Sequence, residues 1–216
     1  MAKPATALFD LDGTLIDSTE AIVESFNAAF AHFNRASPDP EAIIKLIGNP
    51  LHKMFVSLGI EEAEIQGYID RYKDRYRKVC LQKTTLLPRV KEALETLKPI
   101  AAIGVVTTKS ASFSKEILAH FGIDGYFEAI VGFEDAKNPK PHPEPILLAL
   151  ERTRGDKRNA FMIGDTPIDI NAALSAGVTP IALLCGYSTA KDFAPFDCEI
   201  VSNAFEAARS IAKRFL

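Results

Sequence analysis

Two aspartates with the spacing of a catalytic pair follow a short apolar run near the start of the chain. Asp10 and Asp12 come directly after residues 5–9, and Gly13 behind them marks a turn. An ionised carboxylate such as Asp10 can attack phosphorus and form an aspartyl-phosphate. The turn at Gly13 can aim Asp12 at the same ligand, where it can protonate a departing alcohol and then activate water. The pair therefore indicates phosphoryl-transfer chemistry.

Further polar residues follow other apolar runs at the points where strands are expected to end. Thr107 and Thr108 follow one such run. Asp165 follows another, and Asp169 lies one helical turn later. Lys140 lies in a proline-rich loop just before a predicted helix. Because ligands of open α/β sheets bind beyond the carboxyl ends of the strands, we expect all these side chains to converge on the aspartate pair.

Converging carboxylates need a cation. At about 4 Å, each like-charge pair costs roughly 4 kcal/mol at an effective dielectric near 20. Oxygen ligands without clustered histidine or cysteine favour a hard divalent ion, with Mg²⁺ the first choice. Lys140, the hydroxyl of Thr107 and the amides that open the next helix at Ser110 suit a phosphoryl group. The sequence thus predicts a site for a phosphate together with Mg²⁺.

The elements that position these residues form a parallel sheet. After Pro88, short apolar runs alternate with amphipathic segments, which is the rhythm of strands joined by crossover helices. The predicted strands span residues 5–10, 101–106, 129–132, 160–163, 180–184 and, more weakly, 199–201. The predicted helices of this part span residues 90–97, 110–121, 145–154, 167–176 and 204–215.

The segment between the first two predicted strands is expected to be entirely helical. Helices are predicted over residues 17–35, 41–47, 50–58 and 61–80, with Ser18 or Thr19 as N-cap of the first and no strand from Asp17 to Lys83. We therefore predict an α/β protein with two domains. A Rossmann-like parallel-sheet core comprises residues 1–16 and 88–216, and an inserted all-helical cap domain comprises residues 17–87.

Four motifs in this order resemble those of the haloacid dehalogenase (HAD) superfamily, and the helical insertion resembles its type-1 cap. The motifs are Phe9-Asp10-Leu11-Asp12-Gly13-Thr14-Leu15, Thr107, Lys140-Pro141, and Gly164-Asp165 followed by Asp169. The resemblance covers nearly the whole chain. It implies Asp10 as nucleophile and Mg²⁺ ligand, and Asp12 as general acid/base and as a ligand through its main-chain carbonyl.

The same resemblance implies roles for the other motif residues. Thr107 and Lys140 would bind the substrate phosphate, and Lys140 would also hold the nucleophile. Thr108, at the same strand end, is a further candidate for binding the phosphate. Asp165 would complete the metal site, with Asp169 supporting it from outside. The acid at position 12 places the chain in the phosphatase branch, because the true dehalogenases lack an acid there.

The expected substrate is a small phosphorylated metabolite, with 2-phosphoglycolate first. Residues 12–18 and the Gly186-Tyr187 turn look most like phosphoglycolate phosphatases, although Thr108 and Arg89 stand where that family often has Asn and Gly. A phosphosugar mutase resembling β-phosphoglucomutase is the alternative enzyme. A phospho-accepting receiver-like signalling module is the alternative of another class, although it needs neither a second acid nor a large cap. A binding protein with an inactive site ranks last.

Composition excludes several other kinds of function. With 25 basic and 28 acidic residues among 216, the chain lacks the basic excess that nucleic-acid binding uses. No apolar stretch approaches the length of a membrane span, and no signal-peptide core follows Met1, so a cytoplasmic protein is expected. The three cysteines lie far apart and indicate free thiols. The oligomeric state is not indicated by the sequence.

The cap offers its own candidates for contact with the substrate. Asn49, His52 and Lys53 follow Gly48 and are candidates to face the non-phosphate end of the substrate. The last cap helix carries tyrosines at every fourth position, and this spacing favours a role in the core of the cap over a substrate platform. These tyrosines are Tyr68, Tyr72 and Tyr76.

Overall fold

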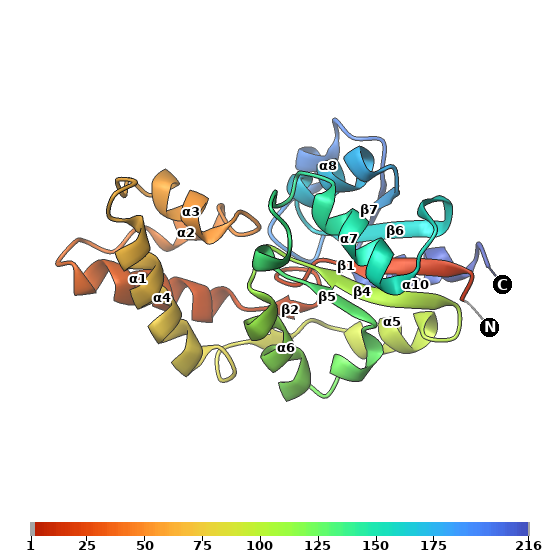
Figure 1. The fold of residues 1–216 in the computed structure, drawn as a ribbon, viewed down its shortest axis with the longest axis horizontal. Helices are drawn as coiled ribbons and strands as arrows, with labels where there is room; N and C mark the ends of the chain where they lie inside the picture. Colours follow the sequence, from red (N-terminus) through yellow and green to blue (C-terminus); the bar gives the residue numbers. More distant parts are fainter. Residues whose placement is uncertain (1–2, 216) are drawn as a thin grey trace.

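The computed structural model describes residues 3–215, so the opening Met1-Ala2 and the final Leu216 lie outside the part described here. A six-stranded sheet of the order β5-β4-β1-β6-β7-β8, with every neighbouring pair parallel, lies to one side of the helical insertion (Figure 1). This confirms the predicted α/β class. The strands are β1 (Ala5–Phe9), β4 (Ala101–Val106), β5 (Ala129–Val131), β6 (Ala160–Gly164), β7 (Thr179–Leu183) and β8 (Glu199–Val201).

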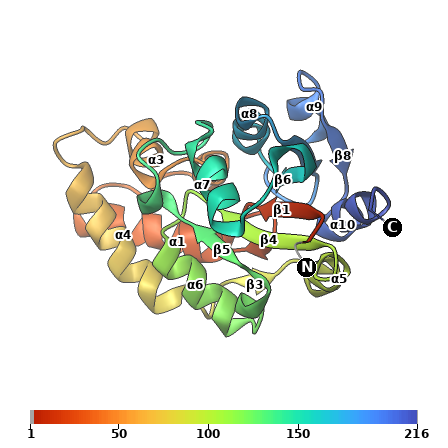
Figure 2. The same ribbon diagram turned by 45° about the vertical axis from the view of Figure 1, so that its right-hand side comes forward.

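Helices cover both faces of this sheet, as crossover connections between parallel strands require. On one face α7 and α8 pack against the central strands, and on the other α5 and α10 lie against each other (Figure 2). The helices are α5 (Val90–Leu97), α6 (Ala111–His120), α7 (Glu144–Thr153), α8 (Pro167–Ala176) and α10 (Ala204–Ala212). The four-residue helix α9 (Ala190–Phe193) was not predicted, since one turn carries no periodic signal.

Strand β1 shows why the predicted strands are apolar at most positions and do not alternate regularly with polar residues. Ala7 and Phe9 point into the larger core cluster with α5 and α10, whereas Leu8 points into the second cluster with α7 and α8. Every residue of β1 is buried, and Asp10 follows directly where the strand ends. Burial on both faces therefore places a carboxylate at the carboxyl edge of the sheet without interrupting the apolar core.

The helical insertion stands beside the sheet (Figure 1). Aromatic side chains pack together between its helices. Its helices are α1 (Thr19–His32), α2 (Pro40–Ile44), α3 (Leu51–Ser57) and α4 (Ile65–Val79). The rings of Phe26 and Phe55 lie 4.6 Å apart between centroids, and the ring of Tyr72 packs edge-on against Phe26 at 5.0 Å. Tyr68 and Tyr76 are also buried, as predicted for the core of this segment.

A short ribbon joins the insertion to the sheet. Strands β2 (Ile16–Asp17) and β3 (Thr85–Leu86) pair antiparallel where the chain leaves and re-enters the sheet region. The prediction of no strand from Asp17 onwards is therefore wrong at its first residue, because a two-residue strand has no detectable alternation. Ser18 occupies the N-cap position of α1, but its side chain makes no capping hydrogen bond.

A helix that crosses a bilayer is long and apolar. None of the helices within residues 3–215 combines the length and the apolar character that crossing a membrane would need.

Candidate active site

Lys140 lies at the centre of a buried polar cluster at the carboxyl edge of the sheet. Its Nζ donates hydrogen bonds to Oδ1 of Asp10 at 2.7 Å, to Oδ1 of Asp169 at 2.6 Å and to the carbonyl of Val106 at 2.8 Å. Burial lowers the pKa of Lys140, but the two carboxylates outweigh this and raise it above its usual value. The lysine is therefore a permanent positive charge fixed between two acids.

Asp10 is 3% exposed and comes from the end of β1. Burial raises the pKa of Asp10 to about 7, even though the neighbouring Lys140 lowers it. Oδ1 is held by Lys140, and no residue within 3–215 donates a hydrogen bond to Oδ2. One oxygen of this carboxylate is thus fixed in orientation, while the other remains available to a ligand.

Asp165 is held from both sides by residues far away in the chain. The hydroxyl of Thr14 donates to Oδ1 at 2.9 Å, and the amide of Tyr187 donates to Oδ2 at 2.9 Å. Burial, and after it the charge of Asp10, raises the pKa of Asp165 well above its usual range. A Cβ on Gly13 or Gly186 would overlap this carboxylate, which explains glycine at both positions.

Asp169 serves the helix and the cluster at once. Its Oδ2 accepts hydrogen bonds from the amide and the hydroxyl of Thr166, forming a capping box at the start of α8. Its Oδ1 accepts from Lys140. One of these donors is the ammonium group of Lys140, so Asp169 is suited to orienting that lysine.

The acidic side chains of the cluster fit a divalent cation. Asp10, Asp165 and Asp169 are buried and offer carboxylate oxygens that all lie within 4.8 Å of one another. Within residues 3–215, Lys140 is the single cation in contact with them, so three ionised carboxylates leave an excess of two negative charges. An all-oxygen donor set with this charge suits Mg²⁺. The side chain of Asp12 does not belong to this group.

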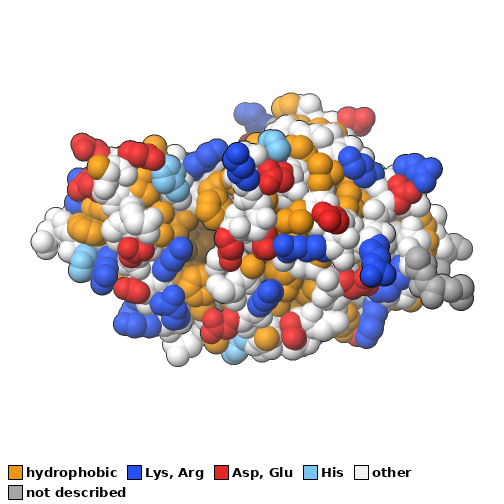
Figure 3. All heavy atoms as spheres, viewed as in Figure 1, with side chains coloured by type: hydrophobic (Ala, Val, Ile, Leu, Met, Phe, Trp, Pro, Cys, Tyr) orange, Lys and Arg blue, Asp and Glu red, His pale blue; other side chains and the backbone are white. Residues whose placement is uncertain are grey.

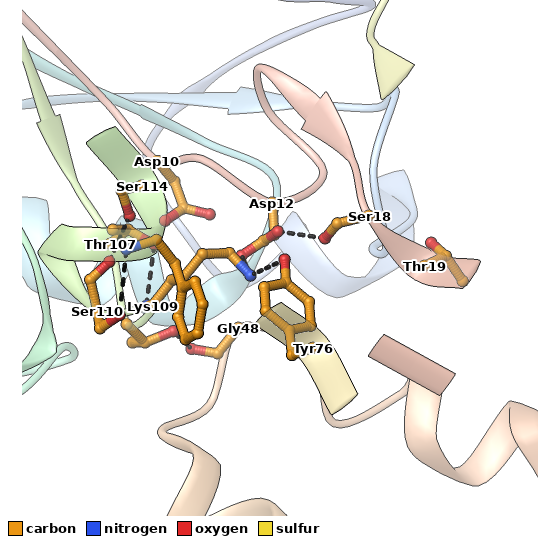
Figure 4. Close-up of polar contacts among 12 residues, drawn as sticks. Asp10, Asp12, Ser18, Thr19, Gly48, Tyr76, Thr107, Lys109, Ser110 and Ser114 are labelled. Atoms are coloured by element: carbon orange, nitrogen blue, oxygen red, sulfur yellow. Dashed lines mark hydrogen bonds and ion pairs between the residues drawn. The ribbon is translucent and has the colours of Figure 1, made fainter. Parts of the chain in front are cut away.

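Asp12 has its own set of partners, which the sequence did not indicate. Ser18 donates to Oδ1, and Nζ of Lys109 lies 3.2 Å from Oδ2 (Figure 4). Lys109 also donates to the hydroxyl of Tyr76 at 2.7 Å and lies 4.4 Å from the centre of its ring. The position of Lys109 directly after the two threonines could have identified it as a site residue from the sequence. Nothing local in the sequence pairs Ser18 with Asp12.

The two threonines at the end of β4 face different surroundings. Thr107 is buried, and its hydroxyl accepts a hydrogen bond from the amide of Lys109 at 3.1 Å. The hydroxyl of Thr108 instead donates to the carbonyl of Gly48 in the helical insertion at 3.1 Å. The structure therefore places Thr107 with the sheet and Thr108 at the contact between sheet and insertion.

A cavity of about 670 Å³ opens beside Asp12, between the insertion and the loop from β4 to α6. Asn49 and His52 line it, as expected of residues that face a substrate. Lys53 does not, and lies instead in a shallower depression beside His142. The predicted cap residues are thus divided between two surfaces.

Comparisons with known proteins match the motifs and the fold. The model of the haloacid dehalogenase-like hydrolase family matches residues 7–183. A putative pyrophosphatase PpaX of Caldanaerobacter subterraneus is 36% identical, over 84% of this chain and 82% of its own. A phosphoglycolate phosphatase of Haemophilus influenzae is 32% identical, over 83% and 85%. The crystal structure of a putative haloacid dehalogenase-like hydrolase from Bacteroides fragilis superposes with a TM-score of 0.90 at 29% identity, covering 95% of this chain and all of that one.

Proposed function

The chain belongs to the haloacid dehalogenase-like hydrolase family and is a phosphatase, and we propose that it hydrolyses a small phosphomonoester through an aspartyl-phosphate in a Mg²⁺-dependent reaction in the cytoplasm. The observation that carries the proposal is the buried contact between Lys140 and Asp10. It fixes one oxygen of the carboxylate and leaves the other free to attack. If the contact between Lys140 and Asp10 were only structural, it would not explain why a second acid, Asp12, lies beside a cavity.

In the first step Oδ2 of Asp10 attacks phosphorus, and the bond from phosphorus to the alcohol oxygen breaks. Lys140 offsets the negative charge that Asp10 and the phosphoryl group share. The hydroxyl of Thr107 and the amides at the start of α6 offer hydrogen bonds to the phosphoryl oxygens. Thr108 is the further candidate at the border with the insertion, and its hydroxyl would have to leave the carbonyl of Gly48 to donate to a phosphoryl oxygen.

Asp12 transfers the proton in each of the two steps. It donates a proton to the alcohol oxygen as that oxygen leaves phosphorus. It then accepts a proton from the water that attacks the aspartyl-phosphate, which releases inorganic phosphate and restores Asp10. Ser18 and Lys109 hold the two oxygens of Asp12, so the carboxyl group keeps one orientation through both steps.

The residues proposed to hold Mg²⁺ are Asp10, Asp165 and the main-chain carbonyl of Asp12. Asp169 supports them through Lys140 without binding the ion. When bound, the ion neutralises negative charge on the phosphoryl group and on the attacking carboxylate. The burial that raises the pKa of both Asp10 and Asp165 supports this assignment, because it makes two ionised carboxylates costly without a counter-ion.

The proposed division of labour follows the chain. Residues 1–16 and 88–216 form the catalytic core, and residues 17–87 form a cap that covers Asp12 and excludes water. The β2–β3 ribbon lies at the border of the two. The substrate candidate from the sequence, 2-phosphoglycolate, is supported by relatives with that name at 29–32% identity. Relatives named as pyrophosphatases are at least as similar to this chain. The names of the relatives therefore indicate two different leaving groups, glycolate and phosphate.

The test is a panel of phosphomonoesters assayed for released phosphate with Mg²⁺ and with a chelator. We expect Mg²⁺-dependent release that Asp10→Asn abolishes. Release that persists in Asp10→Asn would remove Asp10 as nucleophile, and release in the chelator would remove the metal requirement.

The two alternative functions give different products. A hexose 1-phosphate converted to an isomer, with no free phosphate, would favour the mutase. A stable phosphorylated protein after treatment with acetyl phosphate, without turnover, would favour the signalling module.

A further inference from the structure

We propose that the substrate is the phosphate ester of an alcohol with a bulky, uncharged and largely apolar body, such as an aromatic ring or a branched hydrocarbon, and not that of a two-carbon acid. The inference rests on the proposed function, since it assigns the cavity beside Asp12 to the leaving group. It revises the substrate candidate that the sequence favours. The observation that supports this inference is the chemical character of the side chains that line the cavity.

The cavity begins at the acid that would protonate the leaving group. Asp12 is among its lining residues, as are Thr108 and Lys109 at the end of β4. An alcohol whose oxygen leaves phosphorus next to Asp12 therefore has its carbon skeleton in this space. At about 670 Å³ the cavity falls in the range of sites for ligands far larger than glycolate.

Much of its wall on the side of the insertion is apolar and comes from separate helices. Ile22 of α1, Leu51 and Met54 of α3, and Ile69 and Tyr72 of α4 all line it. Figure 3 shows hydrophobic side chains in the recess between the insertion and the sheet domain. A surface built from three helices in this way offers contact area to an apolar body, with the donors of Asn49 and His52 beside it.

The charged residues of the lining are either paired or exposed. Lys109 is in contact with Asp12 and with the hydroxyl of Tyr76. Arg77 and Lys73 are exposed on α4, and Arg77 lies 3.7 Å from Asp74. The carboxylate of 2-phosphoglycolate lies two bonds from the ester oxygen, so it cannot reach beyond the surroundings of Asp12. This carboxylate would compete with Asp12 for Lys109, and it would otherwise face the apolar part of the wall.

The experiment compares three esters of similar chemistry in the Mg²⁺-loaded full chain: ethyl phosphate, 2-phenylethyl phosphate and 2-phosphoglycolate. The first two release primary alcohols of similar basicity, so their kcat/KM ratio reports binding of the phenyl group. We expect 2-phenylethyl phosphate to exceed each of the others by about 10- to 100-fold, the range that burial of a ring in a preformed apolar site gives. A ratio near one, or a preference for 2-phosphoglycolate, overturns the inference while leaving the phosphatase intact.

Substitutions in the cavity wall test whether the preference for the phenylethyl ester arises there. Ile69 is only partly buried, so Ile69→Ser changes the wall with little harm to the core, and it should lower the phenylethyl-to-ethyl ratio about tenfold. Leu174→Ser makes the same kind of change at an exposed position on α8, and its ratio should equal that of the parent. Leu51→Ser repeats the test from α3 if thermal unfolding shows that Ile69→Ser is unfolded. An unchanged ratio in both wall variants contradicts the assignment.

Failure of the proposed function itself would look different. In that case none of the three esters would be hydrolysed in a manner that depends on Mg²⁺ and on Asp10, and the inference would fall with it.

Discussion

Nζ of Lys109 lies 3.2 Å from Oδ2 of Asp12, in a buried contact between the ends of two neighbouring strands. The same ammonium group donates to the hydroxyl of Tyr76, which comes from α4 of the helical insertion. The candidate acid/base is therefore connected to the insertion twice, directly by Ser18 and through Lys109 to Tyr76. Docking of the insertion and orientation of Asp12 are expected to depend on each other.

The first prediction concerns this connection. Lys109→Met should lower kcat about 10- to 100-fold, since Asp12 loses the partner of one oxygen. Tyr76→Phe should lower kcat less, and it should have no further effect in the Lys109→Met background, because Tyr76 acts through Lys109. Steady-state kinetics of the two single variants and the double variant measure this. Lys91→Met, at an exposed position on α5, is the matched control. Fully additive effects would show that the two residues act separately.

The second prediction separates catalysis from binding at Asp12. Asp12→Asn should slow both formation and hydrolysis of the aspartyl-phosphate, by about 10²-fold or more, because the amide cannot exchange protons with alcohol or water. Inorganic phosphate and Mg²⁺ should still bind, since the proposed metal contact is the main-chain carbonyl. Rapid-quench kinetics and calorimetric titration of phosphate give the two readouts. Turnover at the parental rate would remove Asp12 as acid/base.

The third prediction is a pH dependence of Mg²⁺ affinity. Burial raises the pKa of Asp10 to about 7, so below that pH the carboxyl group holds a proton that the ion must displace. Affinity should fall about tenfold for each pH unit below 7 and level off above 8. Burial raises the pKa of Asp165 as well, which acts in the same direction. Titration calorimetry between pH 5.5 and 8.5 checks the effect, and an affinity that is constant over this interval would contradict it.

The fourth prediction concerns the space around Asp165. A Cβ at position 186 would overlap Oδ2 of Asp165 and the carbonyl of Gly13, so Gly186→Ala should displace the carboxylate. We expect Mg²⁺ affinity to fall about 10- to 100-fold, the usual effect of disturbing a group that orients a metal ligand. Gly125→Ala is the matched control, because a Cβ there meets nothing within 4 Å. Equal affinity in the two variants would show that Asp165 is not a ligand.

Local patterns in the sequence were sufficient for most of the fold. Strand β4 and helices α5 and α8 were predicted with the bounds that the structure shows, because continuous apolar runs and helical spacing are properties of neighbouring residues. The short ribbon β2–β3 and helix α9 were missed, since elements of two to four residues contain too few positions to show a period.

The sequence by itself also determined the chemical types at the strand ends: an aspartate pair after β1, hydroxyls after β4 and an acid after β6. Only the tertiary structure decided which of them meet. Lys140 contacts Asp10 across 130 positions of the chain, Ser18 turns from its helix to Asp12, and Thr108 turns to the insertion. Such partners follow from how helices and strands pack in space. A pattern of neighbouring residues records which face of an element is buried, but not which distant side chain lies opposite.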